Sequence, residues 1–252
     1  MLKNAKLSIP AIVLVAGSLV MLWFVILSGV TESTPLSKTF FLQASTGGIT
    51  GARDVSQWTY FFICGPDNKH CGSSRAAPPF GFAWDAHAAN APPELIGTHG
   101  GDTTSSRFYY LWRFGWVFIL LTLFFETLAF FAGFFACCGR LGAAIAFSVT
   151  SFALFCYSVA VSLTTATFVI ARDEFHNVGR DAKIGAYAFG FLWGSYVALL
   201  IADVLFGLGM RSDKGRAAGG GRRFWRGRRF WRRKRSSRSR SHDGRRVKDE
   251  YS

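Results

Sequence analysis

Two acidic side chains interrupt long apolar stretches of the sequence, where an ionisable group is costly and usually has a role. These are Glu126 and Asp203. One hypothesis is a proton or cation path through the membrane, which both acids would line. We favour the alternative that each acid ties helices together, with Glu126 either protonated or hydrogen-bonded to a nearby hydroxyl. The candidate hydroxyl partners are Thr122, Tyr157 and Ser158.

Arginines interleaved with aromatic residues near the C-terminus could bind phosphate. The hexapeptide Gly-Arg-Arg-Phe-Trp-Arg occurs over residues 221–226 and again over 227–232, and a short basic run follows. An arginine can hold a phosphate through two parallel hydrogen bonds, and Trp and Phe favour the lipid headgroup boundary. We predict binding to anionic lipid, with a phosphoinositide as the candidate. The alternative is a generic positive anchor. The candidate lipid-binding residues are Arg222, Arg223, Phe224, Trp225, Arg226, Arg228, Arg229, Phe230, Trp231, Arg232, Arg233, Lys234 and Arg235.

The distribution of charge indicates what must position these residues. The chain has 252 residues, a formal net charge of +14 and 50% hydrophobic residues. Residues 211–252 hold 17 Lys or Arg against 4 Asp or Glu, whereas residues 1–210 hold 12 against 11. A nearly neutral, apolar body therefore carries a basic tail. This division argues against a soluble basic domain and against a nucleic-acid-binding fold.

Four apolar stretches are each long enough to cross a bilayer, whose hydrocarbon core of about 30 Å needs roughly 20 helical residues. We predict helical spans at 8–30, 113–137, 141–170 and 184–210. The spans should be helices because backbone groups in hydrocarbon must be satisfied within the segment. The first span is read as an uncleaved signal anchor, since it outruns a signal-peptide core without a clear cleavage site.

Basic residues predict the orientation of the spans. The positive tail, residues 211–252, is expected in the cytosol, which places residues 1–7 and the tight turn 138–140 there as well. The segments 31–112 and 171–183 are balanced in charge and are expected outside. The chain is thus predicted to be a multi-pass protein with both termini cytosolic.

The long outer loop is expected to form a small domain pinned by a disulfide. Cys64 and Cys71 are the only cysteines on the outer side, where disulfides persist, and they flank strong turn formers. Residues 58–63 favour a strand before that turn. The stiff aromatic segment 77–84 should pack on the strand. The alternative is two free thiols, and no metal site is expected because the loop histidines lack ligand spacing.

Two pairs of small residues suggest contacts in the membrane. Cys137 and Cys138 lie at the cytosolic end of the second span, where palmitoylation is one hypothesis and plain thiols the other. Gly190 and Gly194 form a Gly-x-x-x-Gly step that lets helices approach closely. That step serves either packing within the bundle or self-association into a homo-oligomer.

These features together resemble a known family. Four spans, a long first outer loop and a tryptophan before a cysteine pair are similar to the claudin-like tetraspan superfamily, and more specifically to the fungal SUR/PalI family of eisosome tetraspan membrane proteins. The resemblance implies an all-α transmembrane fold: a four-helix, claudin-like bundle with a small β-containing extracellular loop domain and a disordered basic cytosolic tail. The residues that carry it are Trp58, Cys64, Cys71, Pro78, Pro79, Phe80, the aromatic run 107–113 and the hairpin 137–140.

The resemblance also implies a function. Family members are plasma-membrane proteins of furrow-like microdomains, which a curved cytosolic scaffold stabilises, and they are linked to sphingolipid organisation, cell-wall integrity and endocytic control. We therefore predict a non-catalytic microdomain organiser that binds anionic lipids and other membrane proteins, without cofactor or nucleic acid. The alternatives are a subunit or chaperone of a membrane sensor or transporter complex, as in the pH-sensing branch, and a proton-coupled transporter using Glu126 and Asp203.

Overall fold

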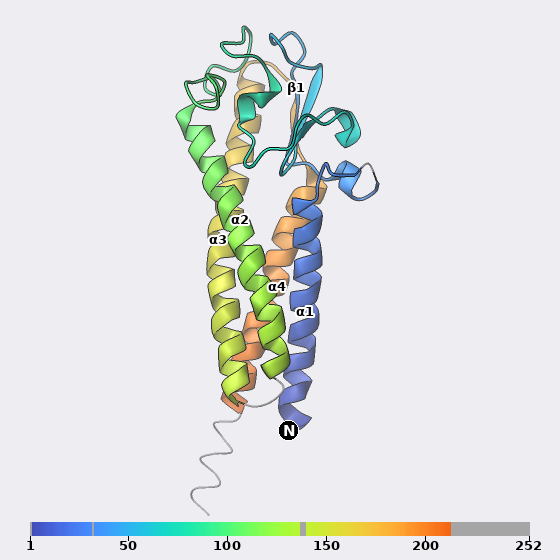
Figure 1. Cartoon of the computed structure of the whole chain (residues 1–252), viewed down its shortest axis with the longest axis vertical. Coiled ribbons are helices and arrows are strands. Elements are labelled where there is room, and N and C mark those ends of the chain that lie inside the picture. The colour runs from blue at the N-terminus through green and yellow to red at the C-terminus, as the bar shows by residue number, and fades with distance from the viewer. Residues whose placement is uncertain (1, 32, 137–139, 213–252) are drawn as a thin grey trace, which may run out of the picture.

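Four long helices form an elongated bundle with a small sheet at one end (Figure 1). The computed structural model describes residues 2–31, 33–136 and 140–212. Helix α2 packs along α3 and α1 along α4, while α3–α4 and α1–α2 contacts close the bundle. All four helices are long and apolar enough to cross a membrane, so the predicted four-helix transmembrane fold is confirmed. The helices are α1 (Leu2–Ile26), α2 (Ser106–Ala136), α3 (Arg140–Asn177) and α4 (Ala186–Ser212).

Two helices extend beyond their predicted spans toward the sheet. Helix α2 begins at Ser106, ahead of the predicted start at 113, and α3 continues to Asn177, past the predicted end at 170. The extensions carry Phe108 and Phe175, which are fully buried. The loop domain packs around these extensions. Their apolar side chains are therefore buried by protein beyond the part of each helix that is expected to lie in lipid.

The sheet joins both loops that connect helices at this end of the bundle. Its four antiparallel strands lie in the order β3-β2-β1-β4. Strand β4 comes from the short loop between α3 and α4, whereas the other three come from the long loop between α1 and α2. The strands are β1 (Leu42–Ser45), β2 (Val55–Trp58), β3 (Ile63–Cys64) and β4 (Ala182–Ile184), and the short 3₁₀ helices are η1 (Leu36–Lys38), η2 (Pro66–Asn68) and η3 (Phe80–Ala83).

Residues 58–63 do not form one strand, so that expectation is wrong. Trp58 ends β2 and pairs with Ile63, which begins β3, so the residues between them form the turn of a hairpin. Thr59 closes this turn because its backbone N–H and its hydroxyl both donate to the Phe62 carbonyl, at 2.9 Å and 3.0 Å. A threonine hydroxyl that bonds nearby backbone competes with continued strand pairing.

The predicted disulfide between Cys64 and Cys71 is confirmed. The loop that it closes is held to the rest of the domain by Asn68, which is buried. The Asn68 side-chain amide donates to the carbonyls of Leu36 and Thr39 at 2.8 Å and 2.9 Å, and its backbone N–H donates to Gln57. Asn68 thus joins the disulfide loop to the segment that carries η1 and to strand β2.

An aromatic core fastens the loop domain to the ends of the helices. Phe168 and Phe175, two turns apart on α3, point into this core from one helix face. Phe168 stacks on Phe41 with ring centroids 4.9 Å apart, and Phe175 lies 5.8 Å from Trp58. Phe80 packs on Trp58 as well, at 5.8 Å, so the 77–84 segment lies against the sheet as expected. Pairs at such distances add about 0.5–1.5 kcal/mol each beyond their burial.

Tyr60 and Trp116 link the hairpin turn to α2 through a reciprocal pair of hydrogen bonds. The Tyr60 hydroxyl donates to the Trp116 carbonyl at 2.8 Å, and the Trp116 indole donates to the Tyr60 carbonyl at 3.2 Å. Their rings stack at 5.3 Å. Burial raises the pKa of the Tyr60 phenol above its ordinary value, so this donor keeps its proton at any physiological pH.

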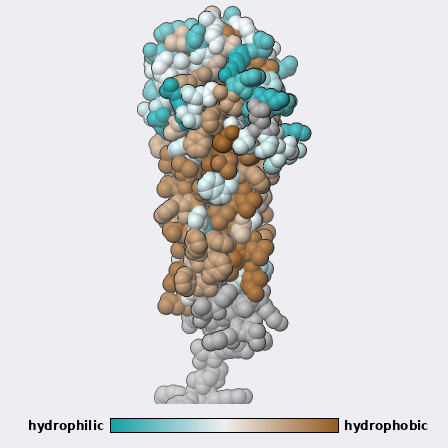
Figure 2. Space-filling model, turned by 45° about the vertical axis from the view of Figure 1, so that its right-hand side comes forward, coloured by the Kyte–Doolittle hydropathy of each residue, from teal (hydrophilic) through white to brown (hydrophobic). Residues whose placement is uncertain are grey.

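The outer surface divides along the length of the bundle. Figure 2 shows hydrophobic side chains over the helical part and hydrophilic side chains gathered at the sheet end. Large apolar side chains are exposed along α2, among them Phe114, Phe124 and Phe131. An apolar belt of this height is what a hydrocarbon core of about 30 Å requires.

A substitution at Gly185, between β4 and α4, can test how strictly the sheet fixes the position of α4. A Cβ atom there would lie 1.7 Å from the Phe40 carbonyl oxygen, whereas a Cβ at Gly190 would meet nothing within 4 Å. We expect Gly185→Ala to lower the free energy of unfolding by about 1–3 kcal/mol or more, the usual cost of overpacking. Gly190→Ala should leave it unchanged or slightly raised, as expected for glycine replacement in a helix.

Thermal unfolding of the two purified variants in detergent, followed by tryptophan fluorescence, measures this difference. Equal melting temperatures would show that the junction between the sheet and α4 accommodates a Cβ atom at Gly185 with no loss of stability.

Candidate functional site

A layer of buried polar side chains crosses the middle of the bundle. Each helix contributes one fully buried member: Ser18 of α1, Glu126 of α2, Tyr157 of α3 and Ser195 of α4. Polar groups inside a membrane are rare because each needs a partner that lipid cannot supply. This layer is therefore the strongest candidate for a site within the membrane.

Hydroxyl groups tie three of the helices together in this layer. The Tyr157 hydroxyl donates to the Leu192 carbonyl of α4 at 2.9 Å and also contacts the Ser195 hydroxyl. The Ser18 hydroxyl of α1 donates to the Ser195 carbonyl at 2.9 Å. Such interhelical hydrogen bonds contribute about 0.6 kcal/mol each on average in a membrane protein.

Glu126 is surrounded by these groups but is not hydrogen-bonded to them. Neither of its carboxyl oxygens has a hydrogen-bond partner within the described residues. Two of the hydroxyls that we expected as partners, those of Thr122 and Ser158, instead donate to carbonyls of their own helices. The Ser18 hydroxyl lies next to the carboxyl, and Tyr157 interacts with it electrostatically. The predicted hydrogen bond to Thr122, Tyr157 or Ser158 is therefore wrong.

Asp203 has a separate and simpler environment. Its carboxyl accepts a hydrogen bond from the Ser151 hydroxyl at 2.9 Å, which connects α4 to α3, and its side chain is partly exposed. No chain of hydrogen bonds joins Asp203 to Glu126 within the described part of the protein. The two acids are thus two local features, and Asp203 acts as a tie between helices.

The glycine pair of α4 has two different surroundings. Gly190 is exposed, with open space where a Cβ would lie, while a Cβ at Gly194 would be 3.4 Å from the Met21 sulfur of α1. Gly194 therefore lies at the contact between α1 and α4, and Gly190 lies on the surface of the bundle.

Several predicted residues lie outside the described residues. These are the palmitoylation candidates Cys137 and Cys138 and every candidate lipid-binding residue from Arg222 to Arg235. Within the described ranges, no group of three or more His, Cys, Asp or Glu side chains could hold a metal ion.

Comparison with known proteins identifies the group to which this architecture belongs. The profile of the SUR7/PalI family matches residues 7–205, which include nearly all of the four helices and the whole loop domain. The chain belongs to the SUR7/PalI family. The match ends before the basic tail, so the family describes the helical body and the loop domain.

Named relatives within this family come from yeasts. Protein SUR7 of Candida albicans is 33% identical over 201 residues, which cover 79% of this chain and 72% of the relative. Protein SUR7 of Saccharomyces cerevisiae is 27% identical over 208 residues, covering 80% and 67%. An uncharacterised plasma membrane protein of S. cerevisiae is 28% identical over 191 residues, covering 73% and 62%.

Two hydroxyls of the polar layer, those of Ser18 and Ser195, are not recognisable from the sequence. Ser18 and Ser195 are small residues in apolar stretches, where serine is common, and only the fold brings them beside Tyr157. Ser151 of α3 likewise bridges two helices, through its hydrogen bond to Asp203. Nothing in the sequence distinguishes a serine that bridges helices from one that bonds its own backbone.

The polar layer predicts opposite responses to two substitutions. Glu126→Met replaces an unpaired, buried carboxyl by an apolar side chain of similar length, so stability should be unchanged or raised. Tyr157→Phe removes the hydroxyl that bonds Leu192 and Ser195, and should cost about 1 kcal/mol. Thermal unfolding in detergent compares them. A clear loss of stability in Glu126→Met would mean that the carboxyl has a stabilising partner.

Proposed function

We propose that this family member organises furrow-shaped microdomains, eisosomes, of the plasma membrane and does so without catalysing a reaction. The observation that carries the proposal is family membership over residues 7–205. One relative, from S. cerevisiae, is described as a plasma membrane protein. In this proposal the sheet end faces outside, toward a cell wall, and both termini are cytosolic.

The packing of the bundle supports a fixed membrane element. The interior hydrogen bonds of Ser18, Tyr157 and Asp203 all join one helix to another. Close packing elsewhere depends on alanines, such as Ala132, Ala146 and Ala202, which are almost fully buried. Small residues and interhelical hydrogen bonds hold helices together in lipid. A body of this kind presents a constant shape to neighbouring lipids and proteins.

The composition of the tail supports a second part of the proposal, contact with anionic lipid of the inner leaflet. Of the 17 basic residues of 211–252, Arg211 lies in the last turn of α4 and 16 follow that helix in the sequence. Each basic residue held near an anionic surface contributes about 1 kcal/mol. The arginines and aromatic residues of the two repeats suit phosphoinositide headgroups in a sphingolipid-rich membrane. A curved scaffold, other membrane proteins and further copies of the chain are the proposed protein partners, in support of cell-wall integrity and endocytic control.

Imaging of the full chain tests the proposal. A fluorescently tagged protein, expressed in yeast, should form immobile patches at membrane furrows, with slow recovery after photobleaching. Replacing the nine basic residues between 222 and 235 by glutamine should disperse the patches, because most of the attraction to anionic lipid is lost. Replacing the eight arginines among them by lysine keeps the charge and should preserve surface attraction while weakening bidentate phosphate contacts.

The two tail variants separate the outcomes. Patches that persist unchanged in the glutamine variant would contradict the role of the tail. A diffuse surface distribution of the unmodified chain would contradict the microdomain role itself.

A further inference from the structure

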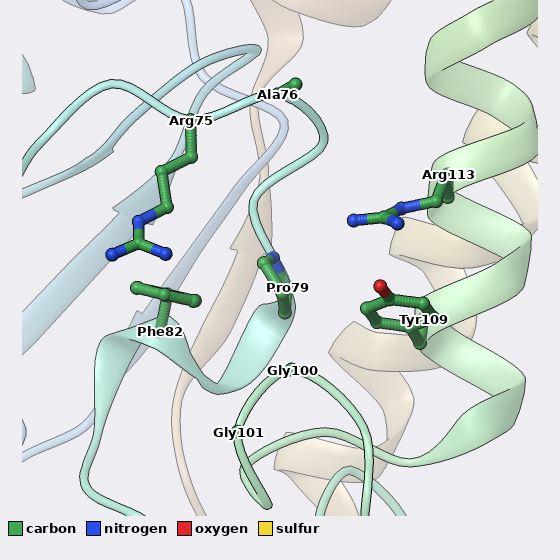
Figure 3. A pocket seen from close by; sticks show the side chains of 8 residues that line it. All are labelled: Arg75, Ala76, Pro79, Phe82, Gly100, Gly101, Tyr109 and Arg113. Atoms are coloured by element: carbon green, nitrogen blue, oxygen red, sulfur yellow. The ribbon is translucent and has the colours of Figure 1, made fainter.

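A cavity of about 550 Å³ lies between the loop domain and the first turns of α2. Three segments form its walls: the chain from Arg75 to Phe82, the turn at Gly100 and Gly101, and the α2 turn that carries Tyr109 and Arg113 (Figure 3). Its volume is within the range of small-ligand pockets, about 300–1,000 Å³. Its position at the end of the apolar belt makes its chemistry relevant to lipid.

Two guanidinium groups line the cavity, and each is held by an aromatic ring. The Arg75 guanidinium carbon lies 4.1 Å from the centroid of the Phe82 ring, and that of Arg113 lies 4.4 Å from the Tyr109 ring. Figure 3 shows Arg113 extending from α2 toward the segment that carries Pro79, and Arg75 descending onto Phe82. A ring that covers one guanidinium face leaves the N–H edges free to donate.

Neither arginine has an acidic partner or a side-chain hydrogen bond within the described residues. The ion pair of the described part of the chain joins Arg172 and Asp173. Arg53 donates to the His70 carbonyl, and Arg180 donates to three backbone carbonyls. The side-chain donors of Arg75 and Arg113 are thus unused, whereas those of Arg53 and Arg180 are occupied. Two guanidinium groups with free N–H donors line one cavity. They can hydrogen-bond an anion that has several oxygens, above all a phosphate.

The remaining walls bring no negative side chain into the cavity. Pro79 and Ala76 are apolar, and Gly100 and Gly101 present only backbone. The neighbouring Asp102 is exposed and forms no ion pair with either arginine. The lining is therefore net positive, which favours anions over cations or neutral ligands.

The place of Arg113 on α2 favours a lipid as the source of the phosphate. Phe114 follows it directly and is 57% exposed, and the apolar stretch continues from there to Ala136. That stretch is about 34 Å long at 1.5 Å per residue, which matches the hydrocarbon core. Arg113 therefore lies at headgroup height, and acyl chains attached to the bound phosphate could run down the exposed apolar side of α2.

We propose that the Arg75–Arg113 cavity binds the phosphate of a lipid headgroup in the leaflet on the sheet side of the membrane. Each arginine donates its N–H edge to phosphate oxygens, and the acyl chains lie against Phe114 and the α2 surface below it. This site is distinct from the tail, because the C-terminal end of α4, after which the tail follows in the sequence, lies at the opposite end of the bundle. The site does not depend on the proposed microdomain function.

Lipid binding to the full-length protein tests the site. The glutamine replacement described above first lowers the net charge of residues 211–252 from +13 to +4, so that the tail attracts the probe much less. Native mass spectrometry in nonionic detergent then counts bound dioleoyl phosphatidic acid, with dioleoylglycerol as the lipid that lacks a phosphate. We expect one phosphatidic acid per chain, and an affinity about tenfold lower in Arg75→Gln or Arg113→Gln, as for loss of charge-assisted hydrogen bonds.

Matched variants keep the test decisive. Arg107 lies on the same helix, is exposed and has no partner within the described residues, but it does not line the cavity. Arg107→Gln should therefore bind as before. Ala76→Glu retains both arginines and places a competing carboxylate beside them, so it should abolish binding. This variant tests the site even if an arginine variant fails to fold.

Three results would overturn the proposal. The first is binding that is unchanged in Ala76→Glu and in both glutamine variants. The second is equal binding of dioleoylglycerol. The third is displacement of phosphatidic acid by equimolar inorganic phosphate or by an acidic polysaccharide such as polygalacturonate, which would assign the cavity to a soluble phosphate or to a wall polymer. Because the same glutamine-substituted tail is present in every variant compared, this proposal and the tail proposal can fail separately.

Discussion

The pairing of β1 with β4 is the constraint on which the rest of this structure depends. Strand β1 follows α1 and strand β4 precedes α4, so three residue pairs, from Leu42 with Ile184 to Ala44 with Ala182, join the two loops in one sheet. Gly185 follows at once and allows α4 to start against the Phe40 carbonyl. The ends of α1, α3 and α4 are therefore fixed by a sheet that lies outside the membrane. The sheet therefore helps to set the relative positions of the helices, in addition to the contacts between helices within the lipid.

Packing between the membrane-spanning helices differs from packing in the loop domain. Lipid tails are as apolar as leucine, so helices in a bilayer gain little from burying large side chains. Accordingly, the largest fully buried aromatic groups, such as Trp58, Phe80 and Phe175, lie in or beside the loop domain. Within the membrane, alanines and hydroxyl-to-carbonyl bonds take their place, and Tyr157 and Phe206 are large exceptions. Glu126 is expected to lower the stability of this interior, because its buried carboxyl forms no hydrogen bond within the described residues.

The parts of the fold that were predictable are those whose signal is local. Apolar length alone predicts the four spans, and two cysteines around a turn predict the Cys64–Cys71 bridge. Strand β4 was not predictable, because Ala182–Ile184 is a short segment in a charged loop that becomes a strand only through β1. The hairpin turn at 59–62 was missed because strand propensity conceals the Thr59 hydroxyl that closes it. In the polar layer, Glu126 was recognisable by its charge, whereas its neighbours Ser18 and Ser195 required the fold.

The cavity between Arg75 and Arg113 depends on the same docking that fixes the helices. Arg75 and Phe82 belong to the segment that Phe80 anchors on Trp58 and Phe168, whereas Arg113 belongs to α2. The spacing of the two guanidinium groups is thus set by the aromatic core, and it exists only when the loop domain lies on the bundle. A phosphate held by both arginines would bind the docked state alone and so stabilise it, since a ligand of the native state always does. Lipid would then act as a component of the fold, bridging loop domain and helix at the boundary where protein core gives way to hydrocarbon.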